Sequence, residues 1–174
     1  MDPASEYGDL VKHRRVFELL ATELIVINFR EVRRRSIKVW RGIPTDFLQW
    51  KPDSPALTIG EMIRHIWSTQ KYYHDSIKLG RSAPVLHDVF DDIPVTSIEE
   101  EISLSEPYFE EFLKYVRQVP TDDLENRMID RSDVGYIRPL GDFLCRIAYH
   151  ESIHTGQLLQ YLRSAGIDRP DIWD

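Results

Sequence analysis

Residues 147–157 read Ile147-Ala148-Tyr149-His150-Glu151-Ser152-Ile153-His154-Thr155-Gly156-Gln157. They lie in a stretch, 139–165, whose apolar residues recur with the period of an α-helix. His150 and His154 are four residues apart, so on a helix their imidazoles lie on one face about one turn apart. At about 100° per residue, both histidines and Glu151 fall within about 60° of the centre of the apolar stripe. The segment therefore predicts a helix that directs three ionisable side chains into the protein interior.

Ionisable side chains that are buried need partners, because removing them from water without compensation costs free energy. Two neutral imidazoles one turn apart are suited to bind a divalent metal ion. The alternative, that His150 and His154 are hydrogen-bonded residues of a helix interface, remains open from this segment alone.

The same residues match the His-Glu-x-x-His pattern of zinc proteases, but the rest of the chain does not fit that class. Such a site needs a third ligand further along the chain, and the 20 residues after His154 contain neither His nor Glu. The strands expected around that motif are also absent from the pattern. A third ligand must come from an earlier helix.

Three further helical patterns precede this one, at about 10–41, 58–79 and 97–119. No segment shows a sustained strand-like alternation, and residues 120–138 are polar and irregular. Helices separated by loops of this length are typical of a four-helix bundle with long crossover connections. We therefore expect an all-α chain that forms one domain over residues 1–174.

Several local signals support these helices. Thr58 with Glu61, and Ser97 with Glu100, have the spacing of capping boxes at two helix starts. The first pattern has one apolar stripe, which comprises Val16, Leu20, Leu24 and Ile27. On the last helix the face opposite Ile147 is expected to meet another helix, from the same bundle or from a second subunit. That face comprises Cys145, Tyr149, Ser152, Gly156 and Arg163.

Two histidines on the second helix are candidates for the third ligand. His65 lies about 120° from the centre of that helix's apolar stripe, where it can face a neighbouring helix. His74 is nine residues further on, about 180° around the helix, and cannot join the same site. The remaining histidines are His13, near the first helix, and His87, in a loop.

Composition excludes several classes of protein. The chain of 174 residues is 42% hydrophobic and 29% charged, which is typical of a globular domain. A single cysteine cannot form an internal disulfide, which suits a reducing compartment. The N-terminus lacks the basic start and apolar stretch of a signal peptide, and the most apolar stretch, 19–29, is too short to span a membrane. We expect a cytoplasmic protein with no membrane partner.

The net charge of −7 argues against a nucleic-acid partner, although one basic cluster is present. The cluster consists of residues 33–35 with Lys38 and Arg41. It closes a helical pattern, where cations are favoured by the helix dipole. We interpret it as a solvated helix end.

The sequence resembles the DinB/YfiT-like superfamily of four-helix-bundle metalloproteins over nearly the whole chain. The marks are Leu57-Thr58-Ile59-Gly60-Glu61-Met62-Ile63-Arg64-His65-Ile66, His150-x-x-x-His154-x-Gly156-Gln157, Leu162-Arg163-x-Ala165-Gly166-Ile167, and the Ile43-Pro44 to Trp50-x-Pro52 connection. The His-x-x-x-His-x-Gly-Gln element is the most specific of them.

The resemblance implies a metal-binding triad of His65, His150 and His154. Characterised members of the superfamily include bacillithiol and mycothiol S-transferases and a thiol-dependent isomerase, some are described as hydrolases, and many are homodimers. Three histidines leave a coordination position open, as in catalytic zinc sites. Zinc, nickel, iron, cobalt or manganese could occupy such a site.

Two functions follow as hypotheses. The first is a metal-dependent enzyme in which activated water or a low-molecular-weight thiol attacks an electrophilic small molecule. Glu151 would then be a proton acceptor or a partner of a ligand, or else a core carboxylate paired with an arginine such as Arg64 or Arg146. The second is a non-catalytic, dimerising helical bundle in which the ion joins two helices.

Overall fold

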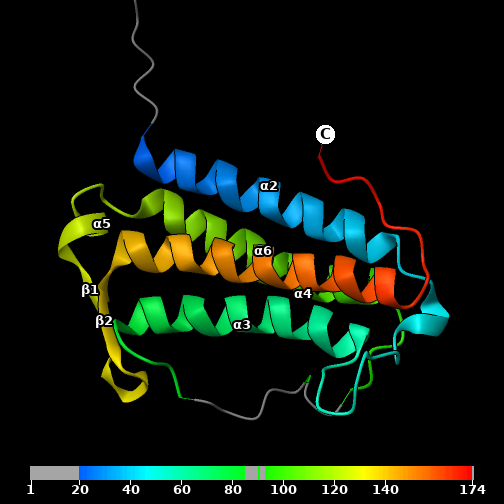
Figure 1. Cartoon of the computed structure of the whole chain (residues 1–174). Coiled ribbons are helices and arrows are strands. Elements are labelled where there is room, and N and C mark those ends of the chain that lie inside the picture. The colour runs from blue at the N-terminus through cyan, green and yellow to red at the C-terminus, as the bar shows by residue number, and fades with distance from the viewer. Residues whose placement is uncertain (1–19, 85–89, 91–92, 174) are drawn as a thin grey trace, which may run out of the picture.

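The computed structural model describes residues 20–84, 90 and 93–173. Four long helices dominate it: α2 (Ala21–Arg41), α3 (Ile59–Leu79), α4 (Ile98–Gln118) and α6 (Leu140–Ser164). They pack lengthwise into a bundle (Figure 1). Both α2 and α3 pack against α4 and against α6. The expected all-α four-helix bundle is therefore the observed fold.

The order of the helices around the bundle explains the long connections. Two of the three connections join helices that are diagonal rather than adjacent, namely α2 to α3 and α4 to α6. The first contains the short 3-10 helix η1 (Thr45–Phe47). Crossover loops of this kind replace the tight turns of a simple up-and-down bundle.

The helix ends follow the predicted signals closely. At the start of α3, the Thr58 side chain accepts a hydrogen bond from the Glu61 backbone N–H, and the Glu61 carboxylate accepts one from the Thr58 N–H. The helix stops at Gly80, whose φ of 69° is left-handed. At the start of α4, Ser97 accepts a hydrogen bond from the Glu100 N–H, but the Glu100 carboxylate accepts from the Thr96 hydroxyl instead, so only half of the predicted capping box forms.

The prediction that one apolar stripe forms the inward face of the first helix is wrong. Residues 10–19 of that pattern, with Val16, lie outside the described residues. Leu20, Leu24 and Ile27 are 56%, 58% and 48% exposed. The buried face of α2 instead comprises Thr22, Val26, Phe29, Arg33, Ser36, Val39 and Trp40. Because three of these seven residues are polar, an apolar stripe could not reveal the inward face.

The segment 120–138 is not irregular throughout. It contains the short helix α5 (Asp123–Asn126) and an antiparallel hairpin of β1 (Met128–Arg131) and β2 (Tyr136–Pro139). The 3-10 helix η2 (Ser132–Val134) connects the two strands. Each strand has only four residues, which is too short for alternation to stand out from the sequence.

The bundle interior has two apolar clusters with a polar layer between them. One cluster includes Phe29 and Phe143, at the hairpin end, and the other includes Trp40 and Leu158, at the opposite end. The polar layer lies between the two clusters along α2 and α6, and its members are Arg33, Ser36, His150, Glu151, His154 and Thr155. Packing therefore brings the ionisable residues of this layer together at mid-height of the bundle.

Across the described part of the chain, no helix has the length and apolarity needed to cross a bilayer. Among the described residues, the back of α6 does not meet another helix of the bundle. Its residues Cys145, Tyr149, Ser152, Gly156 and Arg163 are all exposed. A Cβ atom placed on Gly156 would meet nothing within 4 Å.

Candidate metal centre

Three histidines from two helices converge at mid-height of the bundle. His65 comes from α3, and His150 and His154 come from α6. The Nε2 atom of His150 lies 3.2 Å from that of His65 and 3.1 Å from that of His154. One ring nitrogen from each histidine can be chosen so that all three lie within 4.8 Å of one another.

Hydrogen bonds on the outer side of two rings fix which nitrogens face inward. The Nδ1 atom of His154 lies 2.6 Å from Gln157 Oε1, and that of His65 lies 3.3 Å from Thr69 Oγ1. An Nδ1–H that donates to either oxygen leaves the Nε2 lone pair directed at the common point. Gln157 follows its histidine by three residues and Thr69 by four, so helical spacing alone could have predicted both partners.

The distances between the ring nitrogens suit a shared transition-metal ion. Two nitrogen ligands at about 2.0–2.1 Å in a tetrahedral site are about 3.3 Å apart. The observed separations of 3.1 and 3.2 Å are close to that value. Without a cation, lone pairs this close would repel one another. The donor set therefore fits a divalent transition metal bound by three imidazoles.

The surroundings favour the neutral form of two of these imidazoles, His150 and His65, and metal ligands must be neutral. Burial lowers the pKa of His150 to about 4, with further lowering by His154 and His65. Burial also lowers the pKa of His65, with a smaller contribution from His154. A neutral imidazole has a free lone pair, so neither residue needs to lose a proton before it binds a metal near neutral pH.

The centre is accessible from one side. His65 lies on the wall of a pocket of about 440 Å³, together with Gln49, Glu61 and Ser68. All three histidines are half-buried rather than enclosed. A small molecule can therefore approach the α3 side of the cluster.

Glu151 does not face the histidines. Its carboxylate accepts two hydrogen bonds from Arg33 of α2, from Nε at 2.8 Å and from Nη2 at 3.1 Å. The two side chains are only 5% and 4% exposed. The expected proton acceptor thus has the other suggested role, a carboxylate paired with an arginine. The partner is Arg33, however, and neither Arg64 nor Arg146. Arg64 pairs with Glu101 instead.

The geometry of α6 explains this separation. Residues 150 and 154 are on the side of α6 that faces α3, whereas Glu151 is one residue, about 100°, further round and faces α2. Sequence reasoning missed Arg33 because it lies within the basic cluster assigned to a solvated helix end. A buried arginine on α2 was not distinguishable from its neighbours by charge alone.

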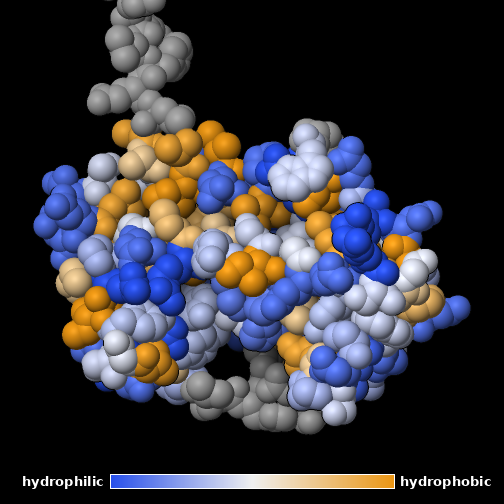
Figure 2. Space-filling view, in the orientation of Figure 1, coloured by the Kyte–Doolittle hydropathy of each residue, from blue (hydrophilic) through white to orange (hydrophobic). Residues whose placement is uncertain are grey.

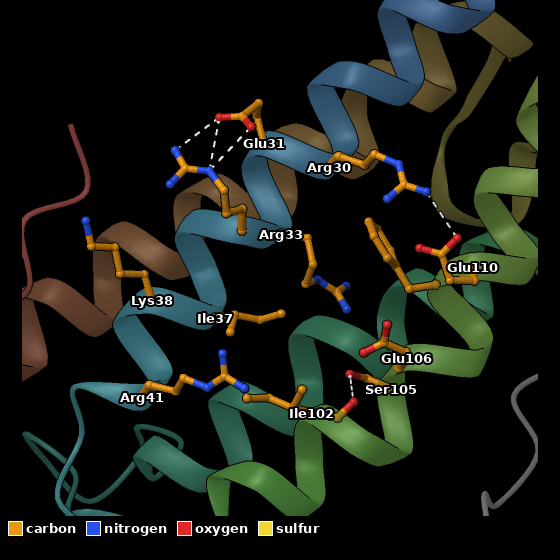
Figure 3. A pocket seen from close by; sticks show the side chains of 12 residues that line it. Arg30, Glu31, Arg33, Ile37, Lys38, Arg41, Ile102, Ser105, Glu106 and Glu110 are labelled. Atoms are coloured by element: carbon orange, nitrogen blue, oxygen red, sulfur yellow. Dashed lines mark hydrogen bonds and ion pairs between the residues drawn. The ribbon is translucent and has the colours of Figure 1, made fainter. Parts of the chain in front are cut away.

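The other members of that basic cluster are at the surface, and much of their charge is paired. A pocket of about 640 Å³ lies between α2 and α4 and includes none of the three histidines (Figure 3). Along its edges Arg30 pairs with Glu110, and Arg41 pairs with Glu99. Across α2, Arg34 contacts Glu31. This alternation of charge does not resemble a phosphate-binding surface.

The remaining histidines do not join the site. His74 is buried on the α4 side of α3, where its ring packs against Phe112 and Tyr115. His13 and His87 lie outside the described residues. The structure therefore brings together His65, His150 and His154, and places His74 and Glu151 elsewhere.

Comparisons with known proteins agree with this architecture. The family model described as the DinB superfamily matches residues 28–158. A DinB-like protein from Bacillus subtilis is 22% identical with a TM-score of 0.66, over 85% of this chain and 95% of that one. A DinB-like protein from Bacillus cereus is 17% identical with a TM-score of 0.69, over 86% and 95%.

YfiT from Bacillus subtilis is 13% identical with a TM-score of 0.72, and 89% of this chain and 93% of that one are covered. It is described as a probable metal-dependent hydrolase with an unusual four-helix bundle topology. No curated protein matches the chain. At these identities the solved structures establish the fold alone, and the family rests on the match over 28–158. The chain belongs to the DinB superfamily.

Proposed function

We propose that the protein is a metal-dependent enzyme in which water or a low-molecular-weight thiol attacks an electrophilic small molecule. His65, His150 and His154 would hold a divalent transition metal. The observation that carries this proposal is the convergence of three Nε2 atoms, with separations of 3.1 and 3.2 Å from the central one. The description of YfiT as a probable metal-dependent hydrolase supports the same class of reaction.

When bound, such an ion supplies Lewis-acid activation of water or of a thiol. The chain itself supplies orientation. Gln157 and Thr69 fix the rings of His154 and His65, and the α3–α6 packing sets the spacing between them. Three protein ligands leave a position for a reactant, which is the arrangement of catalytic zinc sites. The pocket beside His65 provides the approach.

The competing function is a bundle in which the ion only joins α3 to α6. The two functions differ in turnover. The test is metal analysis of protein purified without a polyhistidine tag, followed by assays with thiol acceptors and with hydrolysable esters and amides. We expect about one metal ion per chain, and turnover that is lost on chelation and restored by the metal.

Protein that retains no metal, and takes up none on addition, would refute the metal centre. Protein that binds metal, loses thermal stability on chelation and turns over neither class of substrate would favour the structural function.

We also propose that the protein is a homodimer, with the back of α6 in the interface. Tyr149 and Ile153 are 67% and 42% exposed, and Gly156 offers room for close approach. An adjoining pocket of about 460 Å³ is mostly apolar and includes Leu159 and Trp173. Apolar residues also gather over the first half of the neighbouring helix α2 (Figure 2). Exposed apolar surface of this kind is typical of contacts between subunits.

The substitution Gly156→Arg tests this interface. We expect sedimentation equilibrium to show a dimer for the parent protein and a monomer for this variant, because a long charged side chain blocks close contact between the two surfaces. The control is Glu125→Arg, an exposed position on α5. A parent protein that sediments as a monomer, or a variant that stays dimeric, would contradict the proposed interface.

A further inference from the structure

A second polar cluster lies at the hairpin end of helices α3 and α6, and it is basic. Three guanidinium groups surround the ring of Tyr136. The Cζ atoms of Arg131 and Arg138 are both 5.4 Å from the ring centroid, and that of Arg146 is 4.8 Å from it. Three cations around one aromatic ring is an unusual arrangement in a chain with a net charge of −7.

Only one of these cations has an ion-pair partner among the described residues. Arg138 pairs with Asp142 at 2.8 Å. Among the described residues, no carboxylate lies within the 4.0 Å of an ion pair from Arg131 or Arg146. Arg131 is nevertheless only 7% exposed. Its guanidinium is stabilised by tyrosine rings and hydroxyl groups rather than by a carboxylate, so the cluster keeps a positive charge that an anion would complement.

The contacts of Arg131 leave the O–H groups of the neighbouring tyrosines free to donate hydrogen bonds to a ligand. Its guanidinium donates hydrogen bonds to the hydroxyls of Tyr136 at 2.7 Å, Tyr72 at 3.2 Å and Ser82 at 3.0 Å. A tyrosine hydroxyl that accepts from an arginine keeps its own O–H for another acceptor. Tyr72 and Tyr136 are only half-buried, so these O–H groups can reach a ligand.

This cluster adjoins the metal centre. The ring of Tyr73 lies 6.0 Å from that of His150, and the Arg131 guanidinium lies 5.4 Å from the Tyr73 ring. Arg146 precedes His150 by four residues on α6, which places both side chains on one face about one turn apart. Arg146 is exposed, so it can meet a ligand directly.

We propose that Arg146, supported by Arg131 and Tyr136, binds an anionic group of the substrate, a carboxylate or a phosphate-type group. The thiol or the electrophile would carry this group about one helical turn from its reacting atom. The inference rests on the proposed function, because it defines the substrate class of the same site. Guanidinium groups suit this task, since they pair with both kinds of anion through two parallel hydrogen bonds.

A purely structural role accounts for part of the cluster. Arg131 joins β1 to α3 and to β2, so its loss would disturb the hairpin. The same explanation does not extend to Arg146, whose side chain is exposed and contacts the ring of Tyr136. Arg146→Gln is therefore the informative variant, because it removes the charge without removing a buried support.

The test compares matched small thiols by calorimetry on the metal-loaded protein. The probes are mercaptopropionate, its neutral amide and mercaptoethylphosphonate. We expect one or both anions to bind about five- to tenfold more tightly than the amide, with a preference that weakens at high salt. Arg146→Gln should abolish the preference and leave the affinity for the amide unchanged. Arg169→Gln, an exposed arginine just beyond the end of the same helix, is the control and should keep the preference.

Tighter binding of mercaptopropionate would indicate a carboxylate substrate, and tighter binding of mercaptoethylphosphonate would indicate a phosphate-type one. Equal affinities of all three thiols, or a preference that survives in Arg146→Gln, would overturn the proposal while metal-dependent thiol binding stands.

A second measurement does not depend on the metal. In metal-free protein the Arg146 Nε–H resonance should shift on addition of mercaptopropionate or mercaptoethylphosphonate, and not on addition of the amide. If no thiol binds the metal-loaded protein but this shift occurs, the thiol-dependent form of the proposed function fails and the anion site stands. Absence of the shift with both anions would refute the anion site.

Discussion

Replacing His150 with alanine is expected to abolish metal binding. The Nε2 atom of His150 is the middle one of the cluster, 3.2 Å from that of His65 and 3.1 Å from that of His154. Its loss leaves two ligands on different helices. Removal of a partner that only orients a ligand typically lowers metal affinity 10–100-fold. We therefore expect the loss of a ligand itself to lower affinity by more than about 100-fold, measured by competition with a chelating dye.

A histidine outside the cluster supplies the control. His74 lies nine residues beyond His65, on the opposite face of α3, and is buried against Phe112 and Tyr115. His74→Gln keeps a polar side chain of similar size and should bind metal as the parent protein does. Circular dichroism should show the same helix content in both variants without metal. Equal metal affinity in His150→Ala and the parent protein would eliminate the proposed centre.

The second large effect is expected from Arg33→Ala, which should lower the free energy of unfolding by about 3–5 kcal/mol. The substitution leaves the buried carboxylate of Glu151 without its two hydrogen bonds. It also removes a guanidinium that lies 4.4 Å from the ring of Phe109. Urea denaturation of the metal-free proteins measures the loss. The control is Arg30→Ala on the same helix, which breaks an exposed pair with Glu110 and should cost less than about 1 kcal/mol.

A double variant separates the ion pair from the packing around it. Arg33→Met combined with Glu151→Leu replaces both charges with apolar side chains, which buried pairs often tolerate. We expect this double variant to be more stable than Arg33→Ala and to keep its metal affinity. An equal loss of stability in the exposed and the buried arginine variants would show that the pair has no special role. A loss of metal affinity in the double variant would instead tie Glu151 to the centre.

The helices and the histidines differ in how far local sequence could predict them. The start of α3 was predictable because the two cap hydrogen bonds of Thr58 and Glu61 join residues only three apart in the chain. The relation of His150 to His154 was predictable for the same reason, since a helix fixes it. The inward face of α2 was not predictable, because Arg33 and Ser36 are buried only by virtue of partners on another helix.

The hairpin also could not be predicted from local sequence. Its strands are too short to show a period, and β1 is held beside α3 by backbone hydrogen bonds of Asp130 to Gly80 and Ser82 and by Arg131, which reaches Tyr72. Nothing in the sequence near Arg131 indicates that contact. The proposed anion site therefore could not be recognised before the hairpin was placed beside α3 and α6.

The amino-acid sequence by itself determined the helical bundle, the boundaries of the three long helices after residue 58 and the pairing of two histidines on one face. These depend on hydrogen bonds and spacings within a few residues of the chain. Tertiary structure decided that His65 completes the cluster, that Glu151 turns to Arg33, and that Arg131 and Arg146 have no carboxylate partner among the described residues. Those outcomes depend on which helices lie side by side, and no local pattern encodes the orientation of one helix relative to another.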